Sequence, residues 1–68
     1  MKIHPEITEN MILAAFEESA FGMSDYGFCN ACAAERGSTE PDAREYLCEE
    51  CGEHEVYGSE IFLLELDI

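Results

Sequence analysis

Cys29-Asn30-Ala31-Cys32 and Cys48-Glu49-Glu50-Cys51 are the two stretches that decide the fold of this 68-residue chain. They hold all four cysteines, and fifteen residues separate the two pairs. Two residues between cysteines let a tight turn aim both sulfur atoms at one point, and four thiolates in a tetrahedron form a structural zinc site. The spacing therefore predicts one structural zinc ion per chain, bound by Cys29, Cys32, Cys48 and Cys51.

Four cysteines in two close pairs also have three uses other than binding zinc. Two disulfides are the main alternative, but they are rare in a reducing cytosol. A redox pair of the thioredoxin type would need a β-α-β unit around it, and neither stretch has one. An iron–sulfur centre also takes four cysteines, so the spacing alone does not distinguish iron from zinc.

Residues close to the cysteines refine the predicted site. His54 lies three residues after Cys51 and is a further candidate ligand, although such a histidine is more often a surface or supporting residue. Gly52 suits the left-handed turn that completes a cysteine turn, whereas Ala33 holds the same place after the first pair. His4 has no evident partner in the sequence.

Residues 1–22 are expected to form an N-terminal amphipathic helix. Pro5 can occupy its first turn, or Thr8 can cap a later start, and Gly22 suits its end. Core packing is the main expected use of the apolar face, and a homodimer contact or a partner-binding face is the alternative. The face comprises Ile7, Met11, Ile12, Leu13, Phe16 and Ala20.

The remainder of the chain predicts short strands around the cysteines. Residues 23–28 are expected to be a connector and residues 37–42 a loop, because both are rich in turn-forming residues. Residues 44–47 and 55–57 are expected to be strands that enter and leave the second pair, and Gly58 to interrupt the pattern. The C-terminal segment, residues 59–68, fits a strand by its alternation and a helix by its Ser59 start.

These predictions make residues 1–68 a single α+β domain. In it, the N-terminal helix packs on a small zinc ribbon of short antiparallel strands, which residues 28–58 form.

The charge balance excludes some partners. Sixteen acidic residues against three basic ones give a formal net charge of −13. Four zinc-bound thiolates add four negative charges and the ion two positive ones, which brings the predicted metal-bound form to about −15. Proteins that bind nucleic acids or anionic membranes need basic surfaces, so we expect neither partner here.

The excess of acid instead indicates a basic partner. A net charge of about 2 to 8 in magnitude is enough to keep a small domain soluble. Carboxylates on alternate residues of a strand lie about 6.6 Å apart, comparable to neighbouring phosphates. Glu53 with Glu55, and Glu65 with Asp67, would have this spacing. The candidate partner-binding residues are Asp42, Glu45, Glu49, Glu50, Glu53, Glu55, Glu65 and Asp67.

We expect no catalytic site and a cytoplasmic location. Four protein thiolates leave no open coordination position on zinc, and the chain offers neither a nucleophile–base pairing nor a phosphate-binding glycine loop. The start of the chain lacks a basic and then apolar signal region, because Glu6 and Glu9 follow soon after Lys2.

Most of the chain resembles a group of small zinc-ribbon proteins of phages and prophages of proteobacteria. The segments that carry the resemblance are Gly27-Phe28-Cys29, Glu40-Pro41-Asp42-Ala43-Arg44, Tyr46-Leu47-Cys48, Cys51-Gly52 and Val56-Tyr57-Gly58-Ser59-Glu60. By analogy, small acidic phage proteins include inhibitors that imitate DNA, among them some anti-CRISPR proteins.

Two functions follow as hypotheses. The first is a DNA mimic or inhibitor whose carboxylates occupy a basic surface of a host nucleic-acid-binding protein. The second is a general zinc-ribbon interaction module that docks through the helix face around Met11, Phe16 and Phe21. Added salt would weaken the first kind of binding but not the second.

Overall fold

The N-terminal helix begins at a Thr8 cap, later than the start of the predicted segment. The computed structural model describes residues 2–66, and in it helix α1 spans Glu9–Ala20. The Thr8 hydroxyl accepts a hydrogen bond from the Met11 N–H at 3.2 Å, and the Thr8 N–H donates to the Met11 sulfur at 3.5 Å. Both contacts give hydrogen-bond partners to backbone N–H groups at the start of the helix. Thr8, and not Pro5, therefore determines where α1 begins.

Gly22 ends α1, as predicted. It has a φ of +73°, the left-handed conformation that glycine adopts without strain. The Gly22 N–H donates to the Ser19 carbonyl at 3.1 Å, and the Met23 N–H donates to the Glu18 carbonyl at 2.9 Å. This pair of bonds satisfies carbonyls that the end of a helix leaves free.

The main core lies where α1, the sheet and the C-terminal helix meet. Phe28 and Phe62 are fully buried with their rings edge to face, and the centroids lie 6.0 Å apart. Leu13 and Ala20 are exposed, so the prediction that they belong to the packed face is wrong, whereas Met11 does pack against the core. The buried members are Ile7, Ile12, Ala15, Phe28 and Phe62.

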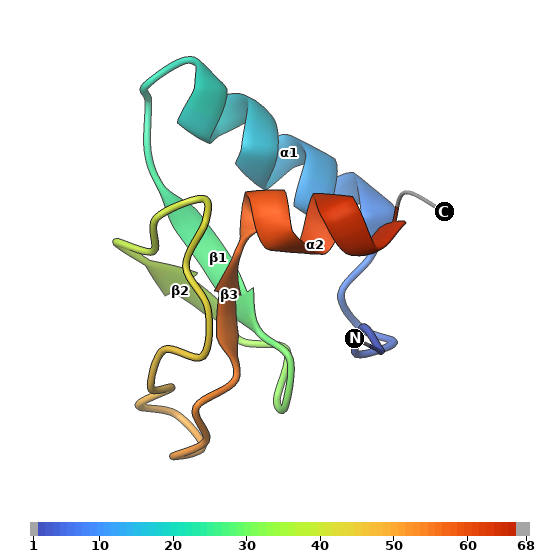
Figure 1. Ribbon diagram of the computed structural model, residues 1–68, viewed down its shortest axis with the longest axis vertical. Coiled ribbons are helices and arrows are strands. Elements are labelled where there is room, and N and C mark those ends of the chain that lie inside the picture. The colour runs from blue at the N-terminus through green and yellow to red at the C-terminus, as the bar shows by residue number, and fades with distance from the viewer. Residues whose placement is uncertain (1, 67–68) are drawn as a thin grey trace.

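A three-stranded antiparallel sheet follows α1, which together with the helices confirms an α+β fold (Figure 1). The strands are β1 (Tyr26–Cys29), β2 (Glu35–Gly37) and β3 (Val56–Gly58), in the order β2-β1-β3. The connector predicted over residues 23–28 is therefore too long. Gly27 stands inside β1 because a Cβ atom there would collide with the Tyr57 carbonyl of β3.

The strand predicted over residues 44–47 is reduced to a single bridge. Tyr46 pairs with Val56 through backbone hydrogen bonds of 3.0 and 3.1 Å, and its neighbours are not paired. The strand leaving the second cysteine pair is confirmed as β3, but it includes Gly58 instead of ending before it.

The C-terminal segment is helical over its described part. Helix α2 spans Ser59–Leu66, and Ile61 and Phe62 are buried in it. Because consecutive residues point to opposite sides of a strand, burial of this adjacent pair on one side fits a helix. Asp67 and Ile68 lie outside the described residues. No helix within residues 2–66 is both long and apolar enough to cross a bilayer.

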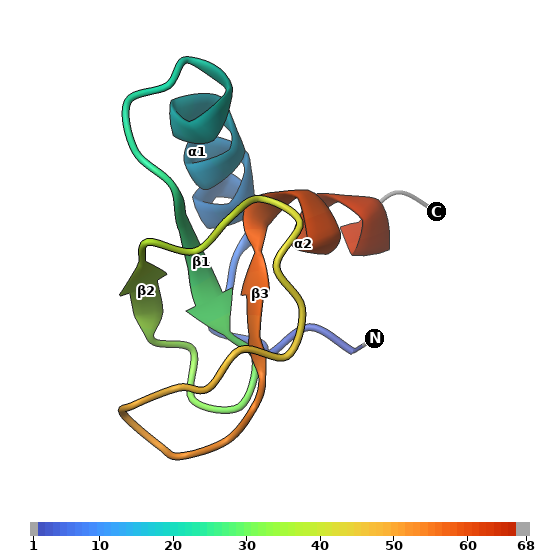
Figure 2. The ribbon, with the colours of Figure 1, turned by 60° about the vertical axis from the view of Figure 1, so that its left-hand side comes forward.

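The loop before the second cysteine pair is held against the start of α2. The Gly58 N–H donates to the Ala43 carbonyl, and the Glu60 N–H donates to the Pro41 carbonyl, both at 3.0 Å. A Cβ atom on Gly58 would collide with the Pro41 carbonyl. Residues 40–44 and 56–60, two separate segments of the sequence, thus pack directly against each other. Both helices lie at one end of the molecule and the cysteine-bearing turns at the other (Figures 1 and 2).

Candidate metal centre

The four cysteine sulfurs form a cluster that could hold a metal ion. All four Sγ atoms lie within 4.8 Å of one another. Cys29 is the last residue of β1, Cys32 lies in the turn that follows, and Cys48 and Cys51 lie in the turn that precedes β3. Cys29 and Cys48 are buried, whereas Cys32 and Cys51 are exposed.

The two turns that carry the cysteines have the same backbone hydrogen bonds. In the first cysteine turn, residues 29–33, the Ala33 N–H donates to the Cys29 carbonyl at 2.7 Å. In the second cysteine turn, residues 48–52, the Gly52 N–H donates to the Cys48 carbonyl at 2.7 Å. Ala33 and Gly52 both have positive φ angles, 67° and 80°. The left-handed turn expected at Gly52 is present, and Ala33 adopts it as well.

The first cysteine turn is anchored through Asn30, which the sequence did not single out. The Asn30 N–H donates to the Glu55 carbonyl at 2.8 Å. Its side-chain Oδ1 accepts from the His4 N–H at 2.7 Å, and its Nδ2 donates to the Lys2 carbonyl at 2.8 Å. Three hydrogen bonds therefore tie this turn to the N-terminal segment and to Glu55, the residue just before β3.

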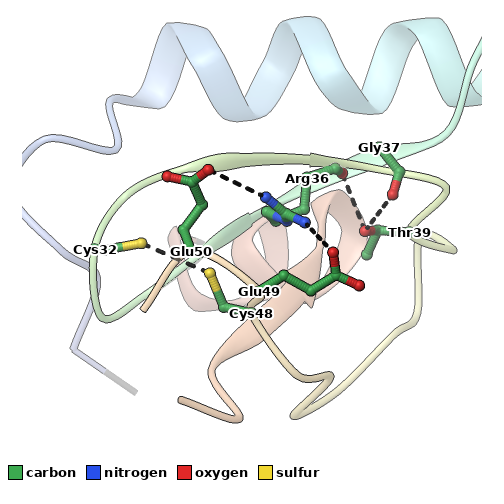
Figure 3. Close-up of polar contacts among 7 residues, drawn as sticks. All are labelled: Cys32, Arg36, Gly37, Thr39, Cys48, Glu49 and Glu50. Carbon is green, nitrogen blue, oxygen red and sulfur yellow. Dashed lines mark hydrogen bonds and ion pairs between the residues drawn. The ribbon is translucent and has the colours of Figure 1, made fainter. Parts of the chain in front are cut away.

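The second cysteine turn is flanked by an ion-pair cluster instead (Figure 3). The Arg36 guanidinium lies 3.7 Å from a Glu49 carboxylate oxygen and 3.9 Å from a Glu50 one. The arginine side chain is 26% exposed, and the two glutamates are 83% and 66% exposed. Ion pairs that involve such exposed carboxylates contribute little to stability. Nothing in the sequence linked Arg36 to this turn.

The sulfur–sulfur distances suit a shared metal ion. Cys29 Sγ lies 3.6 Å from Cys51 Sγ, and Cys32 Sγ lies 3.7 Å from Cys48 Sγ. A tetrahedron with metal–sulfur bonds of about 2.3 Å has sulfur–sulfur edges of about 3.8 Å. A disulfide would need about 2.05 Å, and all four cysteines are free thiols here.

The protein environment differs between the two buried cysteines. Burial raises the pKa of the Cys29 thiol to about 12. Burial also raises the pKa of Cys48, but hydrogen bonds from the Cys51 and Glu50 backbone N–H groups outweigh it and bring that pKa to about 7. A metal ion binds the thiolate form, so it would displace a proton from Cys29 on binding.

Neither histidine joins the sulfur cluster in the described part of the chain. The cluster consists of the four cysteines, and His54 is exposed. His4 acts locally in the N-terminal segment: its Nδ1 accepts a hydrogen bond from the Glu6 N–H at 3.1 Å. His4 thus has partners that the sequence did not reveal.

Most of the predicted partner-binding acids are exposed, but the described ones do not follow strand spacing. Glu53 and Glu55 precede β3, and Glu65 lies in α2, so alternation along a strand places none of them. Glu55 is half-buried, and Asp67 lies outside the described residues. Those that surround the second cysteine turn are exposed, namely Asp42, Glu45, Glu49, Glu50 and Glu53.

Comparison of the chain with protein-family models, curated protein sequences and solved structures finds no match in any of the three. The metal centre therefore rests on its own geometry.

Proposed function

We propose that the chain binds one zinc ion through Cys29, Cys32, Cys48 and Cys51, and that the ion is structural. The observation that carries this proposal is the gathering of four sulfurs at distances close to the edges of a zinc–thiolate tetrahedron. Thiolates favour zinc or iron among the common metals, and four of them leave no coordination position for substrate or water. The role is therefore one of folding and not of catalysis.

Elemental analysis of the purified protein tests this proposal directly. We expect one zinc per chain and loss of folded structure when a strong chelator removes it. Iron in place of zinc would correct the identity of the metal. A protein that keeps its fold without metal would contradict the structural role.

We further propose that this zinc domain binds a basic surface of a nucleic-acid-binding protein, as a DNA mimic or inhibitor. The sequence resemblance favours one form of this proposal, in which the protein comes from a phage and has an anti-CRISPR-like role. It is supported by the net charge of −13 and by exposed carboxylates around the second cysteine turn. The metal would hold those carboxylates in place, and an arginine of the partner would compete with Arg36 for Glu49 and Glu50.

Charge-matched variants test where the basic partner binds. The double variant Glu49→Gln/Glu50→Gln removes two carboxylates beside the metal centre, and Glu6→Gln/Glu9→Gln removes two at the start of α1. We expect only the first to weaken binding of an arginine-rich peptide, measured by fluorescence anisotropy at several salt concentrations. Equal loss in both variants would mean that net charge alone attracts the peptide.

A second candidate function is docking through apolar residues at the C-terminal end of α1, and the exposure of Phe21 favours it. Phe21 is 78% exposed and Met23 is 69% exposed. The face first expected around Met11 and Phe16 is less available, because Met11 packs against the core and Phe16 is half-buried. Binding that persists at high salt and is lost on replacing Phe21 would support this candidate over the first.

A further inference from the structure

A hollow lined by apolar and acidic side chains lies at the C-terminal end of α1. Its volume is about 360 Å³, at the small end of the range for binding pockets. The residues that line it, here called the α1-end patch, are Ala14, Glu17, Glu18, Phe21 and Met23. The four helical positions follow the i, i+3, i+4, i+7 spacing of one helix face. That face is not the one that buries Ile12 and Ala15.

The segment that carries Met23, after the end of α1, is held in a fixed position. Glu18 accepts hydrogen bonds from the Ser24 hydroxyl at 2.9 Å and from the Tyr26 hydroxyl at 3.2 Å. These bonds, with the backbone bond from the Met23 N–H to the Glu18 carbonyl, fix the segment that carries Met23 against α1. A preformed surface loses less conformational freedom when a partner binds.

The negative charges around the α1-end patch favour a partner that carries positive charge. Within residues 2–66, neither Glu17 nor Glu18 forms an ion pair with a cationic group. Two large apolar side chains therefore lie beside carboxylates that have no cation opposite them. A second copy of this chain would bring further carboxylates to the same place, with each copy at −13, so electrostatic repulsion opposes self-association here.

We propose that the α1-end patch binds a partner segment that carries a large apolar side chain flanked by lysine or arginine. The apolar side chain lies against Phe21 and Met23, and the cations lie against Glu17 and Glu18. This inference rests on the proposed binding of a basic partner and adds to it an apolar anchor. The patch lies at the opposite end of the molecule from the second cysteine turn, so it is a separate contact (Figures 1 and 2).

Three synthetic helical peptides test the proposal with the zinc-loaded, ¹⁵N-labelled protein. The first peptide has a leucine face flanked by arginine, the second replaces each leucine by alanine, and the third replaces each arginine by glutamine. We expect the leucine–arginine peptide to bind most tightly and to shift the NMR signals of Ala14, Glu17, Phe21 and Met23. Phe21→Ser should weaken it by about tenfold or more, because a buried apolar contact is lost.

Matched variants separate loss of the patch from loss of the fold. The Phe21 side chain is largely exposed, and only its backbone N–H takes part in capping the end of α1. Phe21→Ser should therefore keep the unfolding midpoint of the parent protein. Met23→Ser provides a second test outside the helix. Leu64→Ala removes another exposed apolar side chain, 58% exposed on α2, and should leave peptide binding unchanged.

The outcomes distinguish this inference from the proposed function. Equal binding of the leucine–arginine and alanine–arginine peptides, unaffected by Phe21→Ser, would overturn the patch but leave binding of a basic partner intact. Equal binding of the glutamine peptide would overturn the requirement for cations. No binding of any peptide at low salt would overturn both. A dimer in analytical ultracentrifugation that Phe21→Ser dissociates would assign the patch to a second copy.

Discussion

The first and second cysteine turns share one backbone conformation and differ in what surrounds them. The first is neutral between its cysteines and is tied by Asn30 to the N-terminal segment. The second carries Glu49 and Glu50, which are exposed and contact Arg36. Each turn contributes one buried and one exposed cysteine to the cluster, but the first is tied to the N-terminal segment and the second carries exposed acidic residues. A metal ion shared by the two turns would fix the acidic surface turn to the anchored one.

Loss of a metal ligand is expected to have the largest effect, because it should unfold both cysteine turns and not one of them alone. Cys48 is fully buried, in a small cluster with Cys29 and Val56. Structural zinc contributes roughly 10–16 kcal/mol in small domains, more than the roughly 5–15 kcal/mol of net stability of a typical protein. We expect Cys48→Ser to lose the metal and unfold both turns, as seen by metal analysis and NMR.

The matched control for that variant is His54→Ala. His54 is exposed and lies outside the sulfur cluster, so its replacement should keep one metal per chain. Loss of metal in this variant would mean that the histidine replaces a cysteine as ligand.

The second prediction compares the residue that follows the first cysteine of each turn. Asn30→Ala removes two side-chain hydrogen bonds, each worth about 0.5–1.5 kcal/mol. We expect it to lower the free energy of unfolding of the metal-loaded protein by about 1–2 kcal/mol. Glu49→Ala, at the equivalent position of the second turn, should change that free energy by about 0.5 kcal/mol or less. Equal effects in denaturant unfolding would show that the two turns are anchored alike.

The sequence predicted the cysteine cluster better than the elements around it. The Cys-x2-Cys spacing is a local signal for each turn, and the pairing of β1 with β3 brings the two turns together. The glycines in the strands were predicted wrongly: Gly27 was expected in a turn and Gly58 to interrupt the pattern, yet both lie in strands. At each position a neighbouring backbone carbonyl lies so close that only glycine fits. Such close approaches depend on tertiary packing, which sequence periodicity does not contain.

Other features depended equally on long-range contacts. Helix α2 was ambiguous in the sequence, since its apolar residues alternate as in a strand while Ser59 suits a helix start. The structure has a helix, in which the adjacent residues Ile61 and Phe62 are both buried. The roles of Asn30 and Arg36 arise from partners many residues away. By contrast, Thr8 and Gly22 could be identified because caps act on neighbouring backbone groups.

The third prediction uses a difference in residue type at the left-handed position that both turns share. Ala33 and Gly52 occupy the same left-handed position, and that conformation costs a residue with a Cβ atom roughly 1 kcal/mol. We expect Ala33→Gly to raise the free energy of unfolding by up to about 1 kcal/mol and Gly52→Ala to lower it by about the same amount. A Cβ atom on Gly52 meets no atom within 4 Å, so the change measures backbone strain. The same sign in both variants, by denaturant unfolding of the metal-loaded protein, would contradict the equivalence of the turns.

The smallest expected effect concerns Tyr46, whose bridge to Val56 leads into the second cysteine turn. The Tyr46 hydroxyl donates to Glu40 at 2.6 Å, and this hydrogen bond raises the Tyr46 pKa above its usual 10.0. A raised tyrosine pKa contributes stability that is present below pH 10 and is lost as the pH rises through the folded-state pKa. Glu40→Ala should lower the Tyr46 pKa and remove that contribution.

Site-resolved NMR titration of the tyrosine rings measures this change. Tyr57 provides the internal control, because burial is the main cause of its raised pKa and Glu40 does not contribute to it. Tyr57 should therefore titrate as in the parent protein. The stability difference between parent and variant should be present at neutral pH and shrink above about pH 10, where Tyr46 ionises in both. An unchanged Tyr46 pKa would mean that water takes the place of Glu40 as hydrogen-bond acceptor. The segment before the second cysteine turn would then be held by the backbone bridge between Tyr46 and Val56 alone.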